Sequence, residues 1–216
     1  RKLSLTEAGE AYYREAGQVL AQLDELDATI SDQTAEPRGL VRVSAPRNFG
    51  ETTLAPAIFE FVARNPMVSI DLRLEDRFVD LVEEGIDVAL RISTLSDSSL
   101  IARRISEMKH VICASPALIS RVGRPVAGEQ LRGVPCVLDT NMPSHSSWRF
   151  VEDGTALSVH VSGPVRVNSP VAAMQAALAG LGFAVLPTYL ADPLVREGRL
   201  VKVLEDEYGA EEGVAV

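Results

Sequence analysis

The sequence has few of the residues that build disulfide frameworks and metal sites. Its 216 residues include two cysteines, Cys113 and Cys136, and three histidines, and none of them stands at a CxxC or metal-ligand spacing. This scarcity excludes a disulfide scaffold and a zinc site. We expect both cysteines to be buried free thiols in a reducing compartment, and we expect no metal and no cofactor.

Long hydrophobic runs and a secretion signal are also lacking. No apolar stretch approaches the roughly 20 residues that a membrane-spanning helix needs, and the first residues do not have the pattern of a signal peptide. The sequence therefore predicts a cytoplasmic protein without a membrane partner.

Positive charge is in deficit. The chain has 21 lysines and arginines and 30 aspartates and glutamates, which gives a formal net charge of −9. An acidic chain is poorly suited to hold nucleic-acid phosphates over a broad face, so we do not expect this chain alone to bind DNA. DNA binding through a further domain is not excluded. Hydrophobic residues make up 46% of the chain, which is enough for a substantial core.

No catalytic motif is present. The sequence has no P-loop, no HExxH and no GxSxG elbow, and the "GLG" at 180–182 follows a predicted helix instead of opening one. His145 lies beside Ser146, but nothing in the sequence would orient it for acyl transfer. We therefore expect no catalytic residues and no enzyme activity.

A long amphipathic helix is predicted over residues 6–36. Thr6 is a suitable N-cap, and the chain then lacks proline until Pro37. Apolar and small residues recur at alternating steps of four and three, which is the heptad pattern of a helix that pairs with another helix. Packing of this helix on its own domain is the alternative. We expect a dimer contact made by Tyr12, Ala16, Val19, Leu23, Leu26 and Ile30.

After the hinge-like "EPRG" at 36–39, strands alternate with helices. The pattern predicts strands at 40–46, 68–74 and 87–92, with helices at 52–66 and 79–85 between them. Such alternation is typical of an α/β unit with a parallel sheet.

A second α/β unit is predicted over residues 107–198. Two strands, 99–105 and 109–115, lead into it. A helix at 116–121, a strand at 134–139 and strand-rich segments at 148–151 and 157–169 follow. Ser169 is the expected N-cap of a helix that ends at Gly180 or Gly182. A buried strand at 183–187, a helix at 188–198 and a strand at 199–204 complete the pattern.

Three polar loops connect strand ends to the segments that follow them. They are "SAPRNFGETT" at 44–53, "RISTLSDSS" at 91–99 and "NSP" at 168–170. Ligands of open parallel sheets bind beyond the carboxyl ends of the strands, where helix N-termini offer free N–H groups. If the two units face each other, these loops would line a cleft for a small polar ligand. Ordinary helix capping by each serine is the alternative interpretation.

In order and spacing, these stretches resemble the LysR-type transcriptional regulators over nearly the whole chain. The resemblance is carried by "LSLTEAGEAYYREA", "GLVRVSAPRNFGETTLAPAIFEFVARNPMVSIDLRL", "DLVEEGIDVALRISTLSDSSLIARRI", "VICASPAL", "VRVNSPVAAMQAALAGLGFAVLP" and "GRLVKVL". It implies an effector-sensing and oligomerising part of a DNA-binding regulator, assembled as a homodimer or homotetramer. DNA would be bound through a winged helix-turn-helix domain that this chain does not include.

The resemblance also implies a fold and a division of the chain. The expected fold is α/β, with two Rossmann-like subdomains as in type II periplasmic binding proteins, preceded by the long linker helix. Residues 1–5 would be the remnant of the wing and 6–36 the linker helix; subdomain I would comprise 39–106 and 199–216, and subdomain II 107–198. The strand at 199–203 would return the chain to subdomain I, and "EEGVAV" would begin a strand that leads to a further helix.

Mapped onto this sequence, the resemblance places the effector between the subdomains. We expect it to be a small organic molecule, anionic rather than cationic, because Arg47 is the one cation of the first loop and could pair with a carboxylate. The expected effector-binding residues are Ser44, Pro46, Arg47, Asn48, Phe49, Ile92, Ser93, Thr94, Asn168, Ser169 and Pro187.

A stand-alone solute-binding protein of the same fold is the alternative function. That alternative lacks a secretion signal and leaves the heptad pattern of the first helix unexplained. An enzyme is third, because no catalytic constellation supports it.

Overall fold

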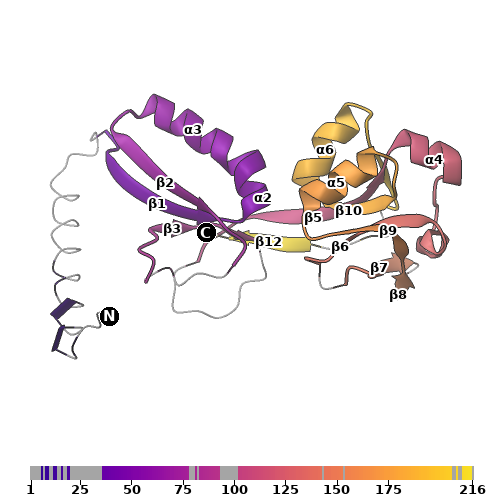
Figure 1. The fold of residues 1–216 in the computed structure, drawn as a ribbon, viewed down its shortest axis with the longest axis horizontal. Coiled ribbons are helices and arrows are strands. Elements are labelled where there is room, and N and C mark those ends of the chain that lie inside the picture. Colours follow the sequence, from indigo (N-terminus) through magenta and orange to yellow (C-terminus); the bar gives the residue numbers. More distant parts are fainter. Residues whose placement is uncertain are drawn as a thin grey trace.

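The computed structural model describes residues 6, 8–9, 12–13, 16, 19, 36–77, 81, 83–92, 102–142, 144–152, 154–205, 208 and 211–215. Two α/β subdomains lie side by side, each with helices over one face of its sheet, and one long strand runs from one subdomain to the other (Figure 1). The two-subdomain α/β architecture expected from the sequence is confirmed.

The first subdomain is built on a parallel three-stranded sheet. Its central strand β1 (Gly39–Ala45) pairs in parallel with β2 (Val68–Leu74) and with β3 (Val88–Ala89). The connection from β1 to β2 is α2 (Arg47–Phe49), a π-helical segment (Gly50–Leu54) and α3 (Ala55–Arg64), which cover one face of this sheet. A strand–helix–strand connection of this kind follows from the alternating pattern of the sequence.

Two expectations for this subdomain are corrected. The predicted helix at 79–85 is not formed where the structure describes it, because residues 81 and 83–85 adopt turns. The predicted strand at 87–92 is divided into β3 and β4 (Arg91–Ile92), which belong to different sheets. Leu90, between them, is buried and donates its N–H to the Ser44 carbonyl.

The crossover is a single strand, β5 (Arg104–Ala114), and the expectation of two separate strands at 99–105 and 109–115 is wrong. Its first half pairs with β12 (Glu211–Ala215) and its second half with β10 (Phe183–Pro187). Because each half has its own partners, the polar residues in the middle of the segment do not interrupt the extended conformation.

The second subdomain has a larger sheet, in which β5, β10, β6 (Pro135–Asp139) and β9 (Ser162–Val167) lie side by side. Four helical segments accompany it: α4 (Pro116–Val122), a 3₁₀ turn (Gly128–Leu131), α5 (Pro170–Leu178) and α6 (Thr188–Arg196). A separate hairpin of β7 (Ser147–Glu152) and β8 (Thr155–His160) packs below it.

Both faces of this sheet are buried, and neighbouring residues alternate between two core clusters. Phe183 and Val185 of β10 belong to one cluster with Phe150 and Leu118, whereas Ala184 and Leu186 belong to the other. The second cluster lies under α5 and α6, where small residues such as Ala173 and Ala177 are buried. Alternation of side chains along a strand produces this division.

The end of the chain corrects one expected boundary. The strand predicted at 199–203 is β11 (Val201–Val203), and it does not return to subdomain I. It pairs with Ile112–Ala114, in the half of β5 that also pairs with β10. The return is made by β12, which pairs with β5 over Arg104–Lys109 and with β4. The described residues 211–215 of "EEGVAV" form a strand, as expected.

The described residues of the predicted linker helix agree with it. Residues 8, 9, 12, 13, 16 and 19 are helical, and Thr6 Oγ1 accepts the Gly9 N–H at 3.2 Å, as an N-cap does. Residues 1–5 and the expected contacts Leu23, Leu26 and Ile30 lie outside the described residues. In the part of the chain that is described, no helix is long and apolar enough to cross a membrane.

Candidate functional site

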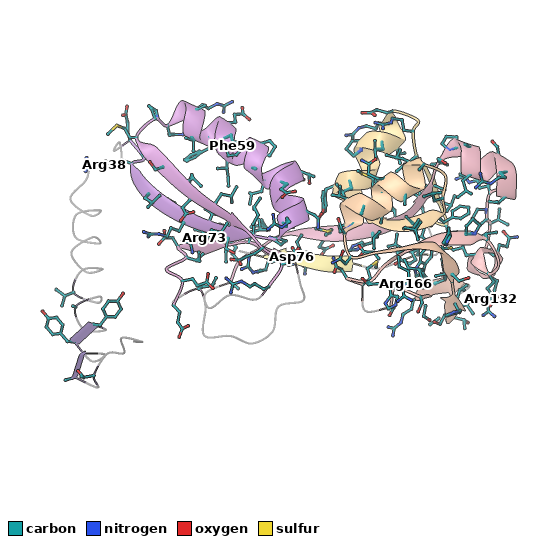
Figure 2. All side chains as sticks on the ribbon, viewed as in Figure 1. Arg38, Phe59, Arg73, Asp76, Arg132 and Arg166 are labelled. Atoms are coloured by element: carbon teal, nitrogen blue, oxygen red, sulfur yellow. The ribbon has the colours of Figure 1, made fainter. Side chains whose placement is uncertain are left out.

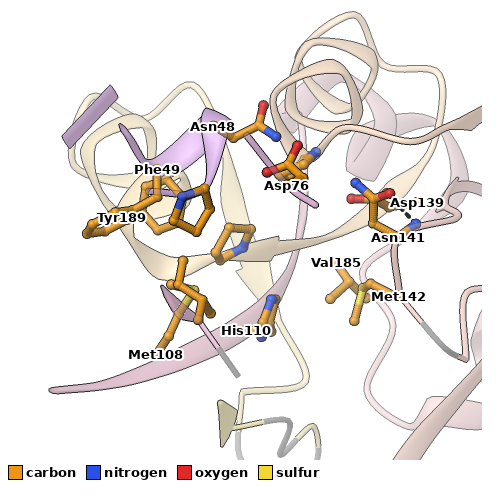
Figure 3. Close-up of a pocket in the computed structure, with 14 residues that line it drawn as sticks. Asn48, Phe49, Asp76, Met108, His110, Asp139, Asn141, Met142, Val185 and Tyr189 are labelled. Carbon is orange, nitrogen blue, oxygen red and sulfur yellow. Dashed lines mark hydrogen bonds between the residues drawn. The ribbon is translucent and has the colours of Figure 1, made fainter. Parts of the chain in front are cut away.

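A cavity of about 160 Å³ lies where the two subdomains meet. The first subdomain contributes side chains from the start of α2, from beyond the end of β2 and from Ile92 of β4, and β5 and the second subdomain contribute the rest (Figure 3). The lining residues are Pro46, Asn48, Phe49, Asp76, Ile92, Met108, His110, Asp139, Asn141, Met142, Pro170, Val185, Pro187 and Tyr189.

Strand ends position these side chains. β1, β2, β6 and β10 all finish at this junction, and Asp76, Asp139 and Pro187 stand at or just beyond the last residues of their strands. Figure 2 shows Asp76 at the junction of the subdomains, whereas Phe59 lies on α3 away from it. The cavity therefore occupies the crevice in which open α/β sheets bind their ligands.

Direct contacts join the two walls. Ser169 Oγ donates to Asn48 Oδ1 at 3.1 Å, which is a hydrogen bond from α5 of one subdomain to α2 of the other. The Phe49 and Tyr189 rings meet edge to face, with centroids 5.2 Å apart. The subdomains therefore hold each other in a particular separation at the cavity rim.

The same serine also caps a helix. Ser169 Oγ accepts the Ala172 N–H at 3.3 Å, and Pro170 occupies the first turn of α5, as predicted. One hydroxyl therefore acts as the acceptor of a cap and as the donor of an inter-subdomain bond.

Two carboxylates from opposite walls line the cavity. Asp139 is 7% exposed; its Oδ1 accepts the Asn141 N–H at 3.0 Å, and no described residue donates to its Oδ2. Burial raises the pKa of Asp139, against the opposing effects of the Asn141 N–H and of the nearby His110. Asp76 is exposed to the cleft, and its Oδ1 accepts the Arg47 N–H at 3.0 Å.

The two carboxylates act on a common neighbour. Burial raises the pKa of the Tyr189 phenol to about 12, and the negative charges of Asp76 and Asp139 both add to this shift. The cavity floor thus carries negative potential from both subdomains, which favours a ligand with a positive group or hydrogen-bond donors.

A second cavity of about 340 Å³ adjoins the first and shares Pro46, Asp76, Ile92 and Asn141 with it. Its further lining residues are Glu75, Arg77 and Arg91. Arg77 is ion-paired with Glu75 at 2.6 Å and with Glu84 at 3.0 Å. The two cavities therefore form one cleft, whose second part is lined by both carboxylate and guanidinium groups.

Arg91 is held differently from Arg77. Its Nη2 donates to Ser44 Oγ at 2.9 Å and its Nη1 to the Leu90 carbonyl at 2.9 Å, and both acceptors are uncharged. Burial lowers the pKa of the Arg91 guanidinium, although the charge of Glu75 acts in the opposite direction. No carboxylate of the described residues forms an ion pair with it.

The predicted effector-binding residues fall into three groups. Pro46, Asn48, Phe49, Ile92 and Pro187 line the cavity. Ser93 and Thr94 lie outside the described residues.

The remaining four predicted residues have other contacts. Ser44 is fully buried and positions Arg91, and Ser169 spans the rim beside the cavity. Asn168 offers its carbonyl to Asn141 Nδ2 at 2.6 Å. The Arg47 side chain is outside the lining, on the exposed side of α2, where its Nη1 pairs with Glu51 at 3.3 Å.

Several lining residues were not predicted from the sequence, and they include Asp76, Met108, His110, Asp139, Asn141 and Tyr189. Asp76 and Asp139 had a signal, because each stands where a predicted strand ends. Met108 and His110 had none, since their exposure to the cleft depends on the continuous strand β5 crossing it.

Neither cysteine offers reactive chemistry. Cys113 and Cys136 are free and fully buried, as expected, and burial raises the pKa of each thiol to about 12. A thiol with such a pKa is protonated at neutral pH and is a poor nucleophile or metal ligand. The described residues contain no cluster of three histidine, cysteine or acidic side chains suited to a metal ion.

The LysR substrate binding domain family model matches residues 34–216 of the chain. The chain belongs to this family. As a LysR substrate-binding domain, it is 33% identical over 207 residues to the "Probable HTH-type transcriptional regulator LtrA" of Klebsiella pneumoniae; this match covers 95% of the chain and 67% of that relative. The chain spans about two thirds of the length of such relatives.

Solved structures support the same assignment. The LysR substrate-binding domain aligns over its whole length with 73% of the full-length virulence activator AphB of Vibrio cholerae, at 29% identity and a TM-score of 0.73. It aligns equally with 73% of CrgA, a LysR-type transcriptional regulator of Neisseria meningitidis, at 26% identity and a TM-score of 0.74. The relatives are regulators and not solute-binding proteins or enzymes, so the alternative of a stand-alone solute binder is not supported.

Proposed function

We propose that this LysR substrate-binding domain binds a small-molecule effector in the cavity between its subdomains, and that the bound effector changes their separation. The observation that carries the proposal is a cavity with walls from both subdomains, joined at its rim by the Asn48–Ser169 hydrogen bond. A ligand that touches both walls has a different binding free energy in an open and in a closed cleft, so it shifts that equilibrium.

In the full-length protein, the change in separation would reach a DNA-binding domain through the helix at 6–36. The proposal that a helix-turn-helix domain binds DNA is supported by the names of the relatives, which are HTH-type transcriptional regulators. The same names favour a cytoplasmic protein that acts without catalysis.

We also propose that the helix at 6–36 pairs two chains, as a homodimer or as part of a homotetramer. Tyr12 and Val19 of its seam are 77% and 55% exposed in the single chain, and the seam residue Ala16 is half-buried. A helix that exposes an apolar seam to water is weakly stable alone and gains stability from a partner.

The effector proposal is tested by blocking the cavity. Asn141 lines both cavities and is exposed, so Asn141→Trp would fill the cleft without disturbing the core. The matched control is Arg149→Trp on the exposed face of β7, outside both cavities. Thermal unfolding would be followed with a library of amino acids, organic acids, amines, sugars and neutral aromatic compounds.

A ligand of the folded state raises the melting temperature by mass action. We expect at least one compound to do so for the parent chain and for Arg149→Trp, and not for Asn141→Trp. With that compound, small-angle X-ray scattering should show a changed radius of gyration in the parent. Equal stabilisation of both variants would show that the effector binds elsewhere.

A further inference from the structure

The charges that line the cleft do not all cancel one another. Arg77 has two carboxylate partners, Glu75 and Glu84. Asp76 and Asp139 accept backbone N–H groups and have no arginine or lysine partner among the described residues. Among the described residues, the hydrogen-bond acceptors of Arg91 are the uncharged Ser44 hydroxyl and Leu90 carbonyl. Two carboxylates and one guanidinium are therefore available to a ligand.

Arg91 is suited to hold an anion. A guanidinium has five N–H donors in a planar fork, and the bonds of Arg91 to Leu90 and Ser44 use two of them. The bond from its Nη2 to the buried Ser44 hydroxyl fixes its direction, which reduces the entropy lost when a carboxylate binds. Arg91 lines the cavity of about 340 Å³, so its free donors border space that a ligand can occupy.

Asp76 and Asp139 are suited to hold a cation. They come from opposite subdomains and border the same cavity of about 160 Å³ (Figure 3). The negative charges of both raise the pKa of the Tyr189 phenol. Asp139 is more than nine-tenths buried, and no described residue donates to its Oδ2. A carboxylate removed from water in this way gains from a charged donor.

We propose that the effector is a small zwitterion, with a carboxylate bound by Arg91 and an ammonium group bound between Asp76 and Asp139. This proposal rests on the proposed function of the cleft. The anion partner is thus Arg91, in place of Arg47, which lies outside both cavities and pairs with Glu51. The two cavities share Asp76 and Asn141, so one small molecule reaches both ends.

The ammonium group has a role in closure. Asp76 and Asp139 lie on opposite walls of one cavity. A cation bound between the two carboxylates attracts both walls. The zwitterion therefore stabilises the closed separation, and an uncharged molecule of the same size does not.

The test compares matched ligands on the 216-residue chain by isothermal titration calorimetry. L- and D-amino acids are titrated first. For each one, the analogous acid without the amino group and the analogous amine without the carboxylate are titrated for comparison. We expect at least one amino acid to bind at least about tenfold more tightly than both of its counterparts, because it loses a charge-assisted contact with either deletion.

Variants assign the two ends. Arg91→Gln and Asp139→Asn should each weaken binding of that amino acid by at least about tenfold, whereas the exposed controls Arg47→Gln and Glu60→Gln should leave it within about twofold. Arg91→Lys keeps the charge and should retain part of the affinity. Unchanged melting temperatures of the variants without ligand would confirm that they fold.

Each other result overturns the zwitterion. If the acid binds as tightly as the amino acid, the ammonium contact does not exist. If the amine binds as tightly as the amino acid, the Arg91 contact does not exist. Full affinity in the Arg91 and Asp139 variants places the ligand elsewhere. If no amino acid binds but a neutral compound does, and Asn141→Trp abolishes its binding, the zwitterion is wrong while the effector function of the cleft stands.

Discussion

Replacing Ser169 with alanine removes two hydrogen bonds of different kinds. One is the cap of α5, the bond from the Ala172 N–H at 3.3 Å, and the other is the bond to Asn48 across the subdomains at 3.1 Å. Loss of a serine N-cap costs about 1 kcal/mol of unfolding free energy. Loss of a hydrogen bond between uncharged groups costs about a further 1 kcal/mol. We therefore expect Ser169→Ala to lower the unfolding free energy by about 2 kcal/mol.

The chain contains a matched control for the cap. Ser115 caps α4 through the Leu118 N–H at the same distance of 3.3 Å and is likewise followed by a proline. Its hydroxyl makes no hydrogen bond to a described residue of the other subdomain. Ser115→Ala should therefore cost only the cap, about 1 kcal/mol. Urea unfolding can be followed through the fluorescence of Trp148, the one tryptophan, which is 3% exposed in the core of the second subdomain.

A double-mutant cycle isolates the bond between the subdomains. Asn48→Ala combined with Ser169→Ala should show a coupling energy of about 1 kcal/mol, and Asn48→Ala with Ser115→Ala should show none beyond error. Zero coupling between Asn48 and Ser169 would refute the reasoning, because it would mean that the rim bond contributes nothing to the separation of the subdomains in solution.

Four further outcomes are expected. Gly163→Ala should lower the unfolding free energy by at least about 2 kcal/mol, measured in urea, because its Cβ would lie 1.8 Å from the Cys136 carbonyl oxygen. Burial raises the pKa of Cys113 and of Cys136 to about 12 in the folded state, from 9.0 for an exposed thiol, so the unfolding free energy should fall between about pH 9 and pH 12 by up to about 1.4 kcal/mol per thiol per pH unit. Leu23→Glu with Leu26→Glu should reduce the mass in light scattering, because the seam would bury charge. This chain alone should not retain duplex DNA sequence-specifically in a gel shift, because a net charge of −9 opposes binding to phosphates.

Each of these has a control or a contrary outcome. Gly198→Ala meets no atom within 4 Å and carries only the strain of a positive φ of 70°, so it should cost about 1–2 kcal/mol. A variant with both cysteines replaced by alanine should lose less unfolding free energy than the parent between about pH 9 and pH 12, because it has no thiols to ionise. Gln18→Glu with Gln22→Glu, on another face of the predicted helix, should leave the mass unchanged; an unchanged mass in the leucine variant would show that the seam is not the contact. Sequence-dependent retention of DNA would contradict the last prediction.

Much of the local structure followed from the sequence because its causes lie within a few residues. Ser115 and Ser169 each precede a proline and cap the helix that the pattern predicts. The strand at 183–187 was predicted from a short apolar run beside glycine, and its residues are all buried. The order of strands and helices then indicated two α/β units, since short connections between parallel strands have few alternatives.

Local signals were misleading where distant partners decide the conformation. The polar middle of Arg104–Ala114 favoured two strands, yet pairing with β12 on one half and with β10 on the other makes it continuous. The reverse holds at 87–92, where one apolar run is divided because its two ends join different sheets.

The site depended most on tertiary structure. The sequence by itself predicted that polar loops at strand ends would line a cleft, and five predicted residues do line the cavity. It could not determine which arginine faces the cleft: Arg47 pairs with Glu51 one helical turn away, whereas Arg91 is turned inward by Ser44, a residue of another strand. Nor could it bring Asp76 and Asp139 to one cavity, because their separation is decided by how β5 joins the two subdomains, and the contacts that hold that geometry come from residues far apart in the chain.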